Sequence, residues 1–211
     1  MTETTASRLL LTERAAILPI LRALPAERFD TPTLLPGWSV RDVLAHCAAA
    51  LGAASTGNLH GFSPAENQVD VDARKGWPIA RLLDELEGGY SGGAAAIAAA
   101  GGRLDLLALG EWTHGGDVRD ALGISNAYAS PGIDEALELV VAGSRSDSSK
   151  MPATVLQLEG RPELLLGTAE PTAKLAADTA TFVRMLGRRN ANPARFKLTG
   201  AEPSQYVIFG G

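Results

Sequence analysis

The sequence predicts an up-and-down α-helical bundle followed by a small α+β domain. Apolar residues recur at the helical period of about 3.6 as far as residue 142 of the 211-residue chain. A polar segment at residues 144–149 interrupts this pattern, and beyond it apolar and polar residues alternate as in strands. We therefore expect a helical domain over residues 1–148 and an α+β domain over residues 149–211.

Four long helices and a shorter fifth are expected in the first domain. Pro19 is a point where the first helix could kink or break. Ser39 and Asp42 form a capping signal before the second helix, and Gly123 stands where the fourth should end. Two glycine pairs weaken the third helix and would let a neighbouring helix approach closely. The expected helices span residues 5–24, 40–54, 78–100, 103–122 and 133–142.

The segment from residue 57 to residue 77 is polar, and we expect a long loop there. It contains His60, Pro64 and several Asp and Asn residues. Loops of this length inside compact domains are often functional or mobile. We interpret His60 as an exposed residue and not as a ligand.

The second domain is expected to contain a hairpin, a third strand, a short helix and a last strand. The hairpin turns at residues 160–162, Gly-Arg-Pro. About 60 residues form a marginal core, so this domain should dock on the first. The expected strands span residues 154–158, 163–166, 171–176 and 196–198, and the helix spans residues 179–187.

Charge and composition exclude several classes of function. The chain has 19 basic and 24 acidic residues, a net charge of −5 and no basic block, so we expect no nucleic-acid or membrane partner. No apolar run approaches ~18 residues and no leader is recognisable, which predicts a cytoplasmic protein. The single cysteine, Cys47, cannot form an internal disulfide and is interpreted as a small core residue.

Glu111 occupies a position where the fourth helix should be apolar. At about 100° per residue it falls on a stripe with Leu107, Ala108 and Val118. An ionised carboxylate in an apolar interior is costly unless a cation or donors compensate it. His114 lies one turn further on the same side of the helix. A metal ion held by both residues is one explanation, and a direct Glu/His hydrogen bond is the other.

His46 on the second helix supplies another imidazole at the edge of a buried stripe. It could point into the bundle, or it could be a partly buried histidine bonded to Asp42. Helical bundles build metal sites by projecting Glu and His inward from facing helices. Two imidazoles and one carboxylate with an open fourth position are the arrangement of catalytic zinc. The candidate ligands are therefore His46, Glu111 and His114.

Two segments carry a more specific pattern. They are residues 36–46, PGWSVRDVLAH, and residues 111–119, EWTHGGDVR, followed by ALG at 121–123. They resemble the mycothiol-dependent maleylpyruvate isomerase family within the DinB-like superfamily. The second domain is also similar to that family's C-terminal domain, notably at residues 154–155 and 186–189. The resemblance covers nearly the whole chain.

The resemblance implies a DinB-like four-helix bundle and a divalent metal, usually zinc, with mycothiol as cosubstrate. His46 matches the first ligand and His114 the last. The family pattern places glutamate four residues before the histidine, whereas this chain has Gly110 there and Glu111 one residue later. Both spacings keep the pair on one helical side, so the implied site keeps Glu111 with altered geometry. Asp117 is a candidate partner that orients the His114 ring, or alternatively a surface residue.

The implied activity is addition of a metal-stabilised thiolate to an electrophilic small molecule. In an isomerase the adduct rotates and the thiol leaves, whereas in an S-transferase the adduct is the product. Arg41 and Arg119 could hold a substrate carboxylate, but we expect them on solvated helix faces. The alternatives are a metal hydrolase and a non-catalytic protein that binds a small molecule or a metal. We expect a monomer or a homodimer.

Overall fold

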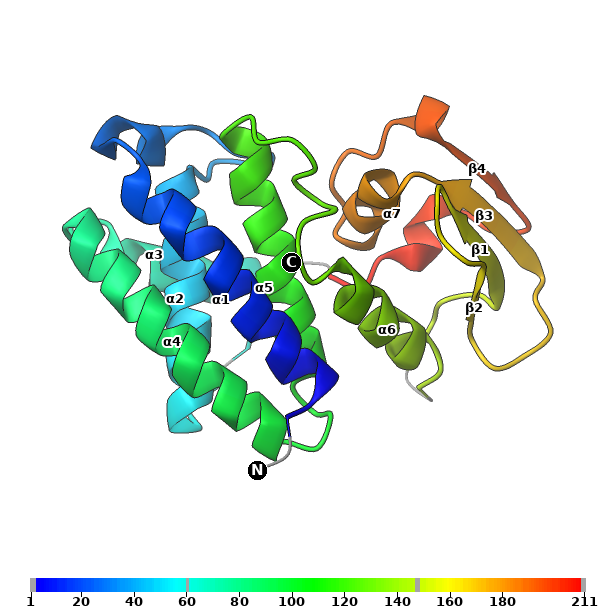
Figure 1. The fold of residues 1–211 in the computed structure, drawn as a ribbon, viewed down its shortest axis with the longest axis horizontal. Helices are drawn as coiled ribbons and strands as arrows, with labels where there is room; N and C mark the ends of the chain where they lie inside the picture. The colour runs from blue at the N-terminus through cyan, green and yellow to red at the C-terminus, as the bar shows by residue number, and fades with distance from the viewer. Residues whose placement is uncertain (1–2, 60, 147–148, 210–211) are drawn as a thin grey trace. The chain divides into compact units, whose positions relative to one another are not determined.

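The computed structural model describes residues 3–59, 61–146 and 149–209. Contacts divide the chain into two compact units, one ending at Ala136 and the other beginning at Leu137 (Figure 1). The expected domain boundary falls at residue 148, which lies outside the described residues, and it stays a prediction. The expected fold class, a helical bundle followed by a small α+β domain, is confirmed.

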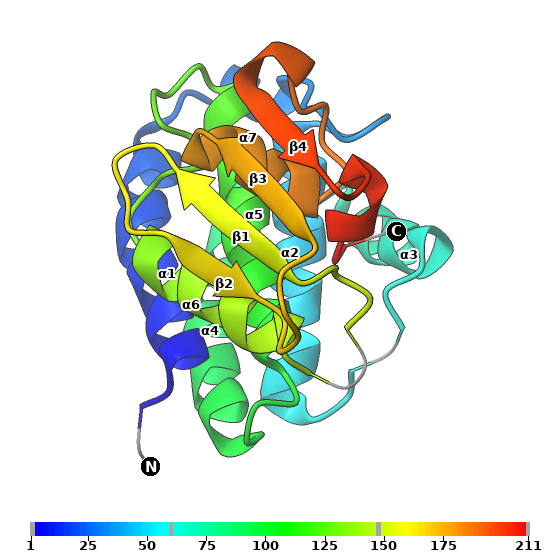
Figure 2. The ribbon, with the colours of Figure 1, turned by 90° about the vertical axis from the view of Figure 1, so that its right-hand side faces the viewer.

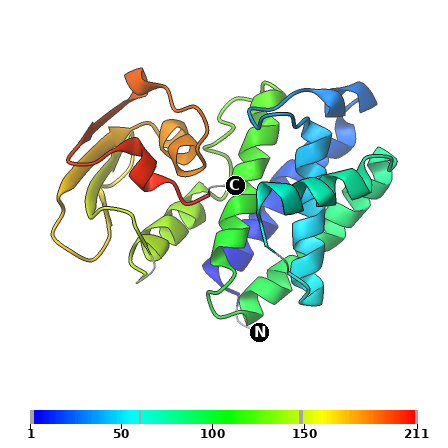
Figure 3. The same cartoon turned by 180° about the vertical axis from the view of Figure 1, so that it is seen from behind.

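Four helices form the bundle of the first unit (Figures 1 and 3). Helices α1 and α2 each pack against both α4 and α5, which closes a ring around the apolar core. A capping box of Ser39 and Asp42 begins α2, as expected. The four helices are α1 (Thr5–Ala23), α2 (Val40–Thr56), α4 (Ile79–Ala99) and α5 (Asp105–Ala121).

Two helices run through the positions where breaks were considered. Helix α1 continues through Pro19 to Ala23, and α4 continues through both glycine pairs. The expected close approach is confirmed, because a Cβ at Gly89 or Gly93 would meet the Leu51 side chain of α2. These glycines therefore serve packing between α2 and α4.

The prediction of a loop over residues 57–77 was wrong, because helix α3 (Pro64–Arg74) lies within it. A capping box formed by Ser63 and Glu66 begins this helix, and Pro64 occupies its first turn. Only Val71 of α3 is buried, so the helix has no apolar stripe for periodicity to reveal. His60 lies outside the described residues.

A short 3-10 helix, η1 (Ala26–Asp30), connects α1 to the segment that leads into α2. Helix α6 (Ile133–Ser144) follows α5 after a connecting segment, and the division between the two units falls within it. No helix among the described residues combines the length and the hydropathy that a bilayer crossing requires.

The second unit contains a four-stranded sheet in the order β2-β1-β3-β4 (Figure 2). Strands β1 and β3 pair in parallel, and the two outer pairs are antiparallel. Helix α7 covers one face, and the strand residues facing it alternate with exposed ones, as a half-buried sheet requires. The elements are β1 (Thr154–Leu158), β2 (Leu164–Leu166), β3 (Ala173–Ala177), α7 (Thr179–Leu186), η2 (Pro193–Arg195), β4 (Phe196–Thr199) and η3 (Pro203–Tyr206).

Candidate functional site

His46 on α2 and His114 on α5 lie next to each other. Their ring centroids are 5.2 Å apart and the rings meet edge to face, at 83°. His46 is 5% exposed, whereas 18% of the His114 side chain is exposed. The indole of Trp38, just before α2, packs against His46 at 5.4 Å between centroids. The structure therefore brings together the two imidazoles that the sequence singled out.

Asp117 contacts His114 from one turn further along α5. Its Oδ2 lies 3.0 Å from His114 Nδ1, and Asp117 is fully buried. The Tyr128 hydroxyl donates to the other oxygen, Oδ1, at 2.6 Å. A carboxylate oxygen accepts hydrogen bonds, so the contact favours a proton on His114 Nδ1. Asp117 is not a surface residue.

Glu111 faces the centre of the bundle and the Cys47 thiol. It is 2% exposed, and none of the described residues gives its Oε2 a hydrogen-bond partner. Burial raises the pKa of Glu111 to about 8, the nearby Glu13 carboxylate raises it as well, and a hydrogen bond with Cys47 opposes them. The carboxyl group is therefore mostly protonated at neutral pH, and a neutral carboxyl group costs less in an apolar interior than an ionised one.

Burial also raises the pKa of the Cys47 thiol, and the Glu111 carboxylate adds to this effect. The interpretation of Cys47 as a core residue agrees with its 3% exposure. A thiol that stays protonated is a poor nucleophile. The chain's own cysteine is therefore unsuited to covalent chemistry.

A second buried carboxylate, Glu13 of α1, forms an ion pair with Arg119 of α5. The guanidinium donates to both carboxylate oxygens, at 2.9 and 3.0 Å. Burial raises the pKa of Glu13 to about 7 and Arg119 opposes this rise. The carboxylate is ionised, because two hydrogen bonds from a permanently charged guanidinium stabilise the charged form. Gly115 leaves the space that the Glu13 carboxylate fills.

Of the two arginines considered for substrate binding, Arg119 does not lie as expected, whereas Arg41 is partly exposed. Arg119 is 3% exposed and pairs with Glu13, so its placement on a solvated face was wrong. Arg41 donates to the backbone carbonyls of Lys75 and Trp77, at 3.0 and 2.9 Å. Both guanidinium groups therefore have structural partners.

The described residues do not fit the three-ligand metal site. No group of three His, Cys, Asp or Glu side chains within 3–59, 61–146 and 149–209 could hold a metal ion. Glu111 forms a hydrogen bond with Cys47, whereas the His114 ring lies against His46. Glu111 as a third ligand stays a prediction.

Sequence reasoning missed Glu13 and Tyr128, and it did not place Arg119 in the core or Trp38 against His46. Glu13 carried a usable signal, because it lies on the buried stripe of α1 as Glu111 does on α5. The burial of Tyr128 could not be predicted from the sequence, because Tyr128 lies in an irregular segment without helical or strand periodicity.

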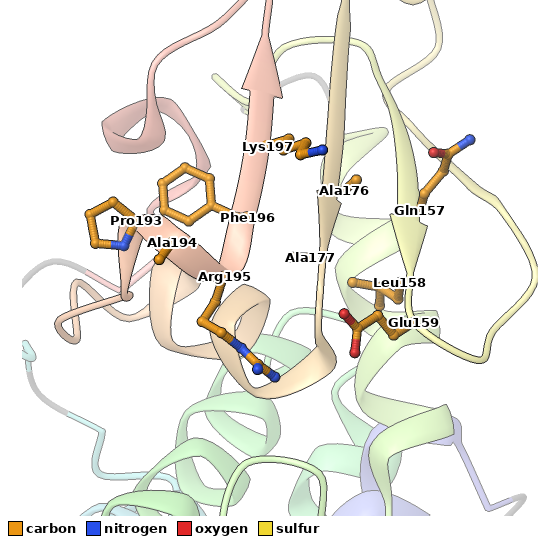
Figure 4. A pocket seen from close by; sticks show the side chains of 10 residues that line it. All are labelled: Gln157, Leu158, Glu159, Ala176, Ala177, Pro193, Ala194, Arg195, Phe196 and Lys197. Atoms are coloured by element: carbon orange, nitrogen blue, oxygen red, sulfur yellow. The ribbon is translucent and has the colours of Figure 1, made fainter.

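The second unit has an open hollow of about 650 Å³ beside the ends of β1, β3 and β4 (Figure 4). Small residues on β3 form part of its lining, and three charged side chains, from Glu159, Arg195 and Lys197, lie around it. Arg195 is tied to Asp178 at 2.9 Å. None of the predicted site residues lines this hollow.

Comparisons with known proteins agree with this architecture. A family model described as "Mycothiol maleylpyruvate isomerase N-terminal domain" matches residues 10–122. A crystal structure of the mycothiol-dependent maleylpyruvate isomerase has a TM-score of 0.56 at 15% identity, covering 96% of this chain and 95% of that one. A histidine-to-alanine mutant of that enzyme has a TM-score of 0.55 at 14% identity, with the same coverage. No curated protein matches the sequence.

Proposed function

Because the chain belongs to the mycothiol maleylpyruvate isomerase N-terminal domain family, we propose that it is a mycothiol-dependent enzyme. In this proposal a thiolate adds to an electrophilic small molecule, as in a maleylpyruvate-isomerase-like isomerase or a thiol S-transferase. The partners are small molecules, and we expect a cytoplasmic monomer or homodimer.

The observation that carries the proposal is the pair of imidazoles at 5.2 Å, with Asp117 behind His114. A histidine whose Nδ1–H points at a carboxylate keeps Nε2 available to accept a proton. His114 is also partly exposed, with 18% of its side chain accessible, so a solute can reach the ring. The buried Cys47 does not compete as nucleophile, so the thiol has to come from a cosubstrate.

The chain's own residues can support each proton transfer. Nε2 of His114 takes the proton of the incoming thiol, and Asp117 stabilises the imidazolium that forms. The thiolate then forms an S–C bond with an electrophilic carbon, and the C=C electron pair moves toward a neighbouring carbonyl. In the isomerase, the former C=C bond is now single and rotates. The C=C bond then re-forms as the thiolate leaves, and the thiolate regains its proton. In the S-transferase, the carbanion takes the proton and the adduct leaves.

The family resemblance also implies a divalent metal, zinc above all, on His46, Glu111 and His114. When bound, such an ion lowers the pKa of a coordinated thiol. The described side chains offer the two imidazoles without the carboxylate, so none of the steps above uses the ion. Elemental analysis of protein purified without chelator tests this separately. Zinc at one per chain, lost in Glu111→Gln, would establish the three-ligand site.

The decisive experiment incubates the purified chain with mycothiol and maleylpyruvate. Isomerisation is followed by absorbance, and adduct formation by mass spectrometry. We expect thiol-dependent turnover that His46→Ala and His114→Ala reduce at least about a hundredfold. Leu106→Ala, at an exposed position of α5, is the control and should retain activity.

A non-catalytic binding protein is the alternative. In that case maleylpyruvate and related electrophiles would persist with mycothiol present. Loss of substrate without any thiol would instead indicate a hydrolase.

A further inference from the structure

The segment between α5 and α6 is fixed to α5 at two points. The Trp112 indole Nε1 donates to the Pro131 carbonyl at 2.9 Å, and the Tyr128 hydroxyl donates to Asp117 Oδ1 at 2.6 Å. Trp112 and Tyr128 are each 1% exposed. The tertiary fold therefore holds the Tyr128 hydroxyl in one place, although its segment has no regular structure.

Gly116 of α5 creates the space for the Tyr128 ring. A Cβ at this position would lie 2.5 Å from Tyr128 Cδ1 and 2.8 Å from Cε1. Glycine in a helix interior lowers the stability of the helix, and close packing of the Tyr128 ring offsets this loss. The residue adjacent to Asp117 thus allows a tyrosine to reach that carboxylate.

The contacts form a continuous path from Tyr128 through Asp117 to His114. Tyr128 occupies Oδ1, and Oδ2 faces His114 Nδ1 at 3.0 Å. A carboxylate that accepts a hydroxyl hydrogen bond on one oxygen is restrained in rotation and remains an acceptor on the other. Tyr128 therefore connects to His114 through Asp117, although it lies outside α5.

We propose that Tyr128 is a positioning residue, whose hydroxyl aligns Asp117 so that His114 carries its proton on Nδ1. Its effect on catalysis rests on the proposed function. Its effect on the His114 tautomer does not, because that is a property of the folded protein alone.

The first test measures the imidazole tautomers by long-range ¹H–¹⁵N spectra of the full chain labelled at histidine. The spectra are recorded near pH 8, where an unperturbed imidazole is neutral. His46→Gln and His114→Gln assign the signals. We expect the Nδ1–H tautomer for His114 in the wild type and a shift toward Nε2–H in Tyr128→Phe. That variant keeps the ring beside Gly116 and loses only the hydroxyl.

The second test measures turnover with mycothiol and maleylpyruvate. Tyr128→Phe should lower kcat roughly tenfold with KM little changed. Tyr206→Phe is the matched control, because it also removes a buried hydroxyl, one that lies 2.8 Å from Thr154 Oγ1 in the second unit. It should leave both the His114 spectrum and kcat unchanged.

An unchanged His114 tautomer in Tyr128→Phe would overturn the inference, whatever the turnover. A changed tautomer supports it even if neither substrate reacts, in which case only the proposed function fails. Should Tyr128→Phe not fold, Asp117→Asn replaces it. Asp117→Asn should cause the same loss of the Nδ1–H signal, and an unaltered spectrum there would equally overturn the inference.

Discussion

The Cys47 thiol lies against the Glu111 carboxyl in the centre of the bundle, where α2 faces α5. Both groups are protonated at neutral pH, because burial raises the pKa of each. Glu111 of α5 is therefore part of a buried polar contact in the core. The imidazole pair lies on a neighbouring side of the same two helices.

The state of Glu111 predicts how stability depends on pH. Its folded pKa, about 8, lies above the ordinary value of 4.5, so the folded protein binds more protons than the unfolded chain between these values. Stability should fall as pH rises through this window, by at most about 1.4 kcal/mol per pH unit for one group. Glu111→Gln should flatten the slope in urea unfolding from pH 5 to 8.

Glu27→Gln, at an exposed position of η1, is the control and should keep the wild-type slope. Identical slopes for Glu111→Gln and the wild type would show that Glu111 is not protonated in the folded protein.

Cys47 should be chemically inert in the native protein. Its reaction with iodoacetamide should be more than about a hundredfold slower than in denaturant, because it requires opening of the bundle and ionisation of a suppressed thiol. Intact-mass measurement should find no native modification and one per chain after unfolding. Ser91→Cys places a thiol on the exposed side of α4 and should react natively at that one site. Rapid native labelling of Cys47 would refute this account.

The Glu13–Arg119 pair predicts a large asymmetry between single and double substitutions. Arg119→Met leaves a buried carboxylate without its cation and should cost roughly 3–5 kcal/mol in urea unfolding. Glu13→Leu combined with Arg119→Met should recover most of this loss, because no charge then remains buried. Arg22→Met removes the exposed contacts to Asp84 and Glu87 and should matter far less. Additive effects of Glu13→Leu and Arg119→Met would rule out the pair as the cause.

Gly116→Ala should be destabilising although alanine favours helices. The new methyl group would displace the Tyr128 ring, at a cost of roughly 1–3 kcal/mol. Gly88→Ala makes the same change in α4, where nothing lies within 4 Å of the new Cβ. It should instead stabilise the protein by about 0.5–1 kcal/mol. Thermal unfolding of both variants checks the opposite signs, and equal signs would contradict the packing argument.

The helices of the bundle were predictable because their signals are local. Apolar periodicity located α1, α2, α4 and α5, and the Ser39–Asp42 box fixed the start of α2. Helix α3 was missed because it buries only Val71, even though Ser63 and Glu66 carried a capping signal. In the second unit, alternation located all four strands, but the order β2-β1-β3-β4 depends on contacts between distant segments.

The candidate site was only partly predictable. A carboxylate on an apolar stripe correctly marked Glu111 as buried, and the same reasoning applied to Glu13 would have found a second buried acid. The contacts between helices could not be predicted. A helical wheel shows which way a side chain points from its own helix, but not which residue of a neighbouring helix it contacts. The structure pairs Glu111 with Cys47 and His114 with His46.

By itself, the sequence determined most of the segments that become helices or strands, the burial of Glu111, and which family the motifs resemble. Only the tertiary structure decided which of those groups face one another. Helical periodicity is a property of consecutive residues, whereas the rotation of α2 against α5 depends on packing among four helices. On α5, Glu111 meets Cys47 in the core, whereas His114, three residues further on, meets His46.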